Sequence, residues 1–182
     1  MNYWIGQAFG LVATVLDISL PQFKKKWQML VVNIGTNTTL GLNLVFLGEI
    51  GSGIFLFMVG VVQAVVNLIH TLRDTKVPKF EYALFFALYV GLGFYGLFTG
   101  PNYVPGINWH NLLELLPIIG AVLNCIFVST RDPVLARKFL VCCNAVWMTY
   151  NAIIGSTAVI GSFFSMVSCV VAIIRNRKTK IP

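Results

Sequence analysis

Charged side chains are scarce in this sequence. Of its 182 residues, 10% are Asp, Glu, Lys or Arg, whereas 57% are hydrophobic. A soluble domain carries about 25% charged residues, because polar groups must cover its water-facing surface. So few charges argue against a soluble protein, and we expect an integral membrane protein whose surroundings are the lipid bilayer.

Histidine and cysteine are rare as well, which argues against metal, disulfide and enzyme chemistry. The two histidines, His70 and His110, fall on opposite predicted sides of the membrane, and no Cys-x-x-Cys pair occurs. The cysteines lie inside apolar runs, where thiols behave as small buried hydrophobes. They are Cys125, Cys142, Cys143 and Cys169. We therefore expect no metal, no cofactor and no enzymatic activity.

What the sequence does have is a series of long apolar runs. Two helical hairpins stand out: one lies between Phe23 and Arg73 and turns at 48–53, and the other runs from 132 to 175 and turns at 155–156. Single runs cover 3–18, 82–98 and 111–128. About 20 apolar residues span a bilayer as a helix. The sequence thus predicts an all-α membrane fold with seven transmembrane helices.

The basic residues test this count. They form four groups, at 24–26, 73–79, 131–138 and 175–180, and give the chain a net charge of +7. With seven spans all four groups share one side of the membrane, and the three remaining connections contain no Lys or Arg. The positive-inside rule then places the N-terminus outside and the C-terminus in the cytoplasm. Charge so arranged serves membrane insertion, and no nucleic-acid partner is expected.

The first and last three spans share sequence features. Ile-Gly-Ser occurs at both hairpin turns, at 50–52 and 154–156, and Phe9-Gly10-Leu11-Val12 parallels Ile119-Gly120-Ala121-Val122. We expect a 3+1+3 arrangement of parallel repeats related by an axis along the membrane normal. The units are residues 1–73, a linker with the fourth helix at 74–106, and residues 107–182. Seven spans suffice for a pathway within one chain.

Several amide side chains fall near the middle of these spans. Amides offer both donors and acceptors, and an aromatic plate suits a neutral polar ring such as that of a sugar or nucleoside. The candidate substrate-binding residues are Asn37, Gln63, Asn67, Asn144, Trp147 and Asn151. The alternative role for each amide is to hydrogen-bond across helices and hold the bundle together.

Carboxylates are nearly absent from the predicted spans. Asp17, near the end of the first span, is expected to lie at the membrane interface. Glu114 lies one turn into the fifth span, near a helix N-terminus that favours a carboxylate, and is the candidate proton site. No charged residue falls at a predicted midplane. The pattern therefore favours movement of a neutral solute without ion coupling.

Short motifs distributed along the chain resemble a known family. They are Phe9 to Ala13, Gln22 to Lys26, Phe46-Leu47-Gly48, Leu115 to Gly120, and Asn151 with Gly155-Ser156. In these motifs the chain resembles the YgjV family of bacterial inner-membrane proteins, which implies a multi-pass protein of the bacterial cytoplasmic membrane. More distantly, the seven-span count and Pro21-Gln22 are similar to the SWEET and PQ-loop transporters.

Two functions are compatible with these features. The first is a small transporter that carries a neutral polar solute without ion coupling. The second is a membrane protein that does not transport and instead binds partners or acts like a receptor. A water-accessible path lined by the amides would favour transport, whereas a bundle packed solid through its middle would favour the second role.

Overall fold

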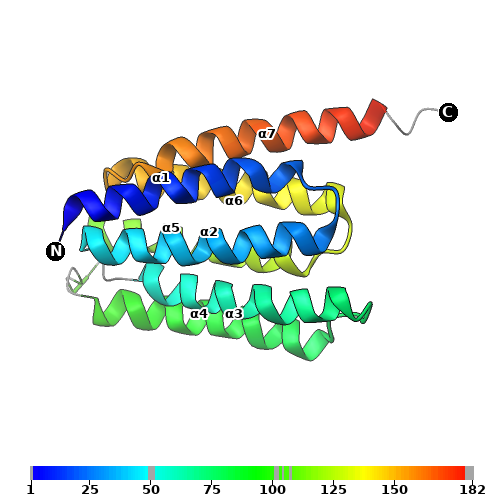
Figure 1. The fold of residues 1–182 in the computed structure, drawn as a ribbon. Coiled ribbons are helices and arrows are strands. Elements are labelled where there is room, and N and C mark those ends of the chain that lie inside the picture. Colours follow the sequence, from blue (N-terminus) through cyan, green and yellow to red (C-terminus); the bar gives the residue numbers. More distant parts are fainter. Residues whose placement is uncertain (1, 49–51, 101–102, 104, 107, 179–182) are drawn as a thin grey trace.

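The computed structural model describes residues 2–48, 52–100, 103, 105–106 and 108–178, and every regular element in these ranges is helical (Figure 1). The helices are α1 (Tyr3–Ser19), α2 (Lys26–Leu47), α3 (Ser52–Leu72), α4 (Lys79–Thr99), α5 (Trp109–Ser129), α6 (Pro133–Ile153) and α7 (Ala158–Lys178). A 3-10 turn, η1 (Leu20–Gln22), follows α1. The predicted all-α fold with seven long helices is therefore confirmed.

Six of the seven helices are long and apolar enough to cross a membrane, and α6 is the exception within the described ranges. At a rise of about 1.5 Å per residue, 20 residues reach across the hydrocarbon core. Helix α6 has comparable length, but it carries Arg137 and Lys138 near its start and Asn144 and Asn151 further along. It nevertheless packs between α5 and α7 inside the bundle.

The helices alternate in direction, so their connections gather at two ends of the bundle (Figure 1). We name the end at which α1, α3, α5 and α7 finish the basic end, because the connections there carry the Lys and Arg residues. The other end, at which α2, α4 and α6 finish, is the turn end. This separation of charge agrees with the predicted span order, while the side that faces the cytoplasm stays a prediction.

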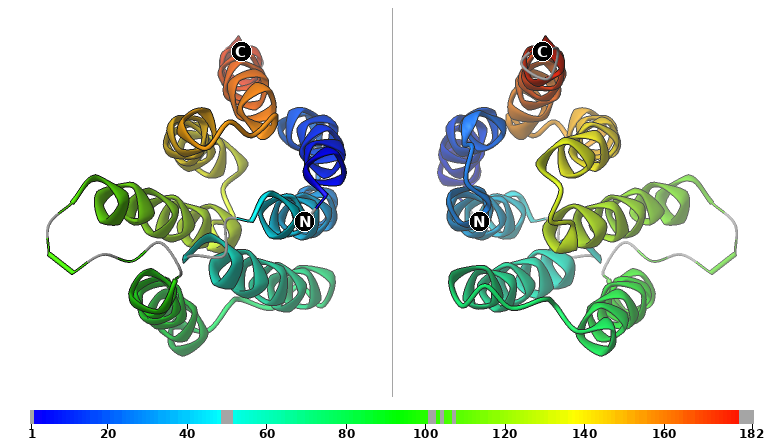
Figure 2. Two further views of the ribbon diagram at one scale, coloured as in Figure 1. Left: turned by 90° about the vertical axis from the view of Figure 1, so that its left-hand side faces the viewer. Right: turned by 90° about the vertical axis from the view of Figure 1, so that its right-hand side faces the viewer.

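Viewed along the helices, six of them form a ring (Figure 2). The order around it is α1, α2, α3, α5, α6, α7, and contact between α7 and α1 closes it, while α4 lies outside against α3 and α5. The pairings of α1, α2 and α3 thus recur in α5, α6 and α7. This order suits two three-helix units, although the expected 3+1+3 repeats and their boundaries stay a prediction.

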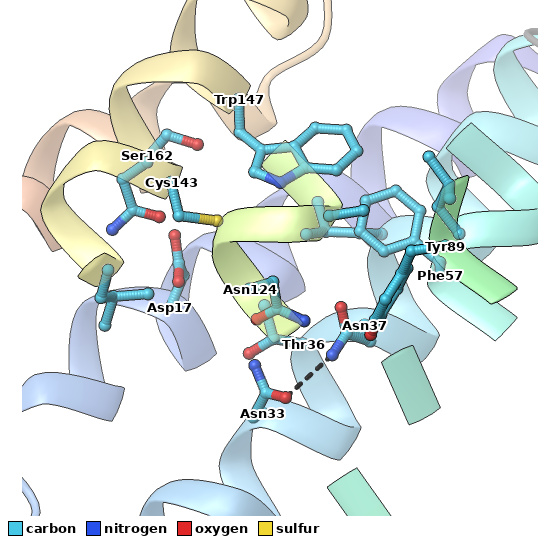
Figure 3. A pocket seen from close by; sticks show the side chains of 15 residues that line it. Asp17, Asn33, Thr36, Asn37, Phe57, Tyr89, Asn124, Cys143, Trp147 and Ser162 are labelled. Carbon is cyan, nitrogen blue, oxygen red and sulfur yellow. Dashed lines mark hydrogen bonds between the residues drawn. The ribbon is translucent and has the colours of Figure 1, made fainter. Parts of the chain in front are cut away.

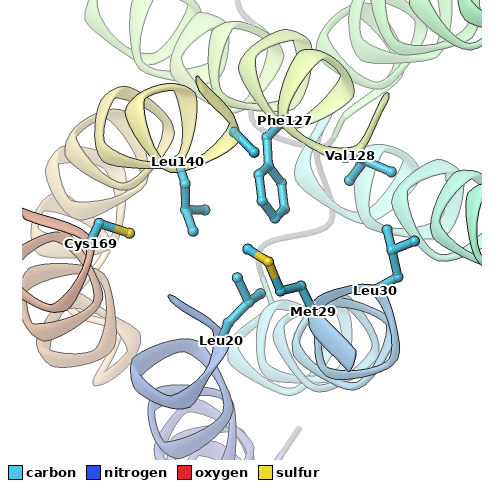
Figure 4. Close-up of a cluster of buried hydrophobic side chains, with 8 residues drawn as sticks. Leu20, Met29, Leu30, Phe127, Val128, Leu140 and Cys169 are labelled. Carbon is cyan, nitrogen blue, oxygen red and sulfur yellow. The ribbon is translucent and has the colours of Figure 1, made fainter. Parts of the chain in front are cut away.

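One apolar cluster fills the centre of the ring toward the basic end (Figure 4). We name it the basic-end cluster. Its buried members are Leu20, Met29, Leu30, Phe127, Val128, Ala136, Leu140 and Cys169. Leu20 follows α1, while Met29 and Phe127 come from α2 and α5, so opposite sides of the ring meet here.

A second apolar cluster lies nearer the turn end, and we name it the turn-end cluster. Its buried members are Leu44, Phe57, Cys143, Trp147 and Tyr150. The rings of Phe57 and Trp147 stack with their centroids 4.8 Å apart. Since Phe57 is on α3 and Trp147 is on α6, this stack also joins the two sides of the ring.

Contact between α1 and α7 depends on glycine. A Cβ atom on Gly161 of α7 would lie 2.7 Å from the Cα atom of Thr14 on α1. Near the turn end, the amide of Asn43 donates to the carbonyl oxygen of Gly6 at 2.8 Å and its oxygen accepts from Ser156 at 2.9 Å. Small residues that let two backbones approach closely are typical of helix pairs in membranes.

The second hairpin turns at Ile154-Gly155-Ser156. Gly155 in the second hairpin has φ +69°, a left-handed conformation that suits glycine. Ile50 and Gly51 of the first Ile-Gly-Ser lie outside the described residues.

We predict that Gly161→Ala destabilises the protein, because the new methyl group meets the backbone of Thr14. Overpacking of this kind costs about 1–3 kcal/mol. Gly91 of α4 is the matched control, since a Cβ there meets nothing within 4 Å. Thermal unfolding in detergent should show a lower midpoint for Gly161→Ala and an unchanged or higher one for Gly91→Ala. Equal midpoints for both variants would contradict close packing of α1 on α7.

Candidate functional site

A small polar cavity lies inside the ring between the two apolar clusters (Figure 3). Its volume is about 40 Å³, and Leu140 of the basic-end cluster and Phe57 of the turn-end cluster both contribute to its wall. Its polar lining residues are Asp17, Asn33, Thr36, Asn37, Asn124, Asn144 and Ser162. A water molecule needs about 10–15 Å³ measured in this way, so the cavity has room for about three.

Helix α2 supplies one polar face of the cavity. Thr36 and Asn37 follow Asn33 by three and four residues and therefore lie on the same side of the helix as Asn33. The amide of Asn37 donates to the side-chain oxygen of Asn33 at 3.0 Å. Gly60 of α3 makes room for this pair, because a Cβ there would lie 3.2 Å from the Cγ atom of Asn37.

Helix α6 supplies the facing wall. Asn144 donates to the hydroxyl oxygen of Ser165 on α7 at 2.8 Å, and Trp147 lies one turn further along. The indole packs directly on Gly120 of α5, where a Cβ would lie 2.7 Å from its Nε1 atom. This packing holds the ring system of Trp147 beside the cavity.

Asp17, which was expected to lie at the membrane interface, lies on the cavity wall. The chain continues helically beyond it, through Ser19 and the 3-10 turn η1, so Asp17 is further from the end of the span than its apolar run suggested. The hydroxyl group of Ser165 lies near the carboxyl group of Asp17. Figure 3 shows Asp17 and Ser162 on one side of the cavity, with Phe57 and Tyr89 on the other.

The predicted site residues divide into two groups. Asn37, Asn144 and Trp147 come together around the cavity. The other four residues are absent from its lining. They are Gln63, Asn67, Asn151 and the candidate proton site Glu114.

Gln63 instead joins three helices and reaches the cavity wall only through Tyr89. Its oxygen accepts from the hydroxyl group of Tyr89 on α4 at 2.8 Å, and its amide nitrogen lies 3.2 Å from the hydroxyl oxygen of Ser129 on α5. Asn67 donates to the backbone oxygen of Gln63 at 2.9 Å. These amides satisfy one another and the backbone, the role that the sequence left open as the alternative.

Asn151 and Glu114 lie toward the turn end. The side chain of Asn151 is buried, with 3% of its surface exposed, and its backbone oxygen accepts from the amide of Ser156 at 2.9 Å. Glu114 is half-buried in the second turn of α5. Neither side chain contributes to the polar wall described above.

Several lining residues were not among the predicted candidates. Asn33 and Thr36 share a helical face with Asn37, and this spacing is a signal that could have identified them. Asn124 is an amide within an apolar run, and this isolated polar side chain could have identified it. Tyr89 and Ser162 carried none, because aromatic and hydroxyl side chains are common throughout these helices.

We predict that Gln63 and Tyr89 stabilise the bundle as a pair. Each single variant, Gln63→Leu or Tyr89→Phe, leaves the other buried group without its hydrogen-bond partner, whereas the double variant removes both. A double-mutant cycle on the free energy of unfolding should give a coupling of about 0.6–1.7 kcal/mol. Tyr95→Phe, at an exposed tyrosine of the same helix, should leave stability unchanged. Strictly additive losses would refute the pair.

Comparison with known proteins gives the chain a family. No curated protein and no solved structure matches it. The relation to SWEET and PQ-loop transporters therefore stays a prediction. One family model, Imp-YgjV, described as "Bacterial inner membrane protein", matches residues 4–180. This match covers nearly the whole sequence and agrees with the helical fold and its candidate membrane spans. The chain therefore belongs to the Imp-YgjV family of bacterial inner membrane proteins.

Proposed function

We propose that this inner membrane protein transports a small neutral polar solute through the central cavity. The supporting observation is a polar cavity that two apolar clusters enclose within the ring. Polar groups inside a membrane protein are costly, and they tend to gather where a solute or ion passes. Transport is favoured over catalysis because amides bind polar solutes without exchanging protons.

The two apolar clusters are suited to act as gates. In the basic-end cluster, Leu20 and Met29 of the first half of the chain meet Phe127 of the second half. In the turn-end cluster, Phe57 of the first half stacks on Trp147 of the second. Apolar contacts can separate without leaving a buried donor or acceptor unpaired. Separation at one end would open the cavity to one side of the membrane.

The volume of the cavity indicates that this conformation is closed. Small-molecule sites usually measure about 300–1,000 Å³, whereas this cavity has about 40 Å³. A sugar or nucleoside could enter only after the halves of the ring move apart. Asn37, Asn144 and Trp147 would then supply hydrogen bonds and an aromatic surface to a neutral polar ring.

The same small volume is the observation that favours the alternative. A bundle whose interior never opens would serve as a membrane protein that binds partners or acts like a receptor. The two functions differ in one measurable property, which is whether water and small polar reagents reach the residues that line the cavity.

We predict that a polar thiol reagent modifies Cys143 but not Cys125. Both thiols are buried, with 3% and 0% of their surface exposed, but Cys143 lines the cavity and Cys125 does not. Two variants, each retaining one of these cysteines, would be treated in membranes with a small methanethiosulfonate. An open conformation populated at about 0.1–10% suffices for labelling of Cys143.

His110→Cys in a cysteine-free background provides the accessible control, because His110 is exposed at the turn end. Equal protection of Cys143 and Cys125, while this control reacts, would indicate a dry core. That result would remove transport and leave the partner-binding role.

A further inference from the structure

Asp17 is the one charged residue in the lining of the central cavity as the structure describes it. The expectation of uncoupled transport depended on the absence of a carboxylate from the interior of the spans. Its presence beside neutral amides gives the cavity a group that can gain or lose a charge. This observation is independent of the amides that support the proposed function.

Two basic residues on helices that line the cavity, Lys26 and Arg137, are directed to backbone oxygens. The ammonium group of Lys26 on α2 donates to the carbonyl oxygen of Phe127 at 3.0 Å. The guanidinium group of Arg137 on α6 donates to the carbonyl oxygens of Pro21 at 3.3 Å and Phe23 at 3.4 Å.

Asp17 has no basic partner in the described part of the chain, where the ion pair found joins His70 and Glu81 at the basic end. The titratable groups near Asp17 on the facing helices are the thiols of Cys143 on α6 and Cys169 on α7. An ionised carboxyl group in low dielectric without a cation is strongly unfavourable. In the closed cavity, charge neutrality therefore requires a proton or a bound cation.

The neighbours of Asp17 support its ionised form as well. Asn144 donates to the hydroxyl oxygen of Ser165 at 2.8 Å, and this hydroxyl group lies near the carboxyl group of Asp17. Because the hydroxyl oxygen already accepts from Asn144, its own O–H is free to donate to the carboxylate. When the cavity opens to water, this chain of donors would stabilise the carboxylate after it has released a proton.

We propose that Asp17 is a proton-binding site through which transport is coupled to the proton gradient. The proton binds a carboxylate oxygen when the cavity opens to one side and leaves to water when it opens to the other. With the proton bound the cavity is neutral, which matches a neutral solute. The coupling role depends on the proposed transport function, whereas proton binding by Asp17 can be measured separately.

The test uses dicyclohexylcarbodiimide, an apolar reagent that enters the bilayer and modifies protonated carboxyl groups. The acid proton passes to a carbodiimide nitrogen while the carboxylate oxygen bonds to its central carbon. The intact protein in lipid vesicles would be labelled over a pH series, and peptides mapped by mass spectrometry. Labelling of Asp17 should fall by about tenfold for each pH unit above its midpoint.

Three variants sharpen this result. Asp17→Asn should lose the modification, and Glu114→Gln, at a carboxyl group away from the cavity, should retain it at Asp17. Ser165→Ala removes the hydroxyl group that supports the carboxylate, so labelling of Asp17 should persist to higher pH. A role of Ser165 in packing alone would leave the pH profile unchanged.

Three outcomes would overturn the proposal. The first is an unmodified Asp17 at every pH. The second is protection of Asp17 by sodium ions but not by choline, which would assign a metal-cation site instead. In both cases a reactive Cys143 would leave the transport function standing. The third is a labelled Asp17 with a protected Cys143, which would remove transport and the coupling role with it.

Discussion

The interior of this bundle is governed by the cost of placing polar groups in hydrocarbon. Hydrocarbon offers no hydrogen bonds, so backbone and side-chain donors there need partners within the protein. Gln63 meets this requirement by joining α3 to α4 and α5. Asn43 meets it by joining α2 to α1 and to the connection before α7. The amides that line the cavity also lie in the interior of the bundle, but the packing beside them leaves a small space.

The apolar clusters and the cavity depend on each other. Leu140 belongs to the basic-end cluster and also lines the cavity, while Phe57 and Trp147 do the same for the turn-end cluster. The packing at both ends therefore contributes to the cavity wall, which Leu56 of α3 and Tyr89 of α4 complete. A movement that disturbs either cluster therefore changes the shape of the cavity. Access to its polar groups depends in this way on the conformation of the bundle.

The sequence was a good guide to the helices and a partial guide to the site. Apolar runs and the grouping of Lys and Arg predicted all seven helices and their alternation. They did not identify which amides share a space, because in a membrane the lipid-facing and inward-facing sides are both apolar. Gln63 and Asn144 therefore looked alike in sequence, whereas the structure assigns them to different surroundings. The sequence did not identify Asp17 as a lining residue, because its apolar run ends beside it whereas its helix continues.

Arg137 has a consequence for how the protein is made. Its side chain has 2% of its surface exposed, and its donors reach carbonyl oxygens of Pro21 and Phe23, just beyond α1. These acceptors belong to residues synthesised long before α6, the helix whose composition is least suited to lipid. During biogenesis, the turn after α1 thus offers the emerging α6 a ready partner for its charge.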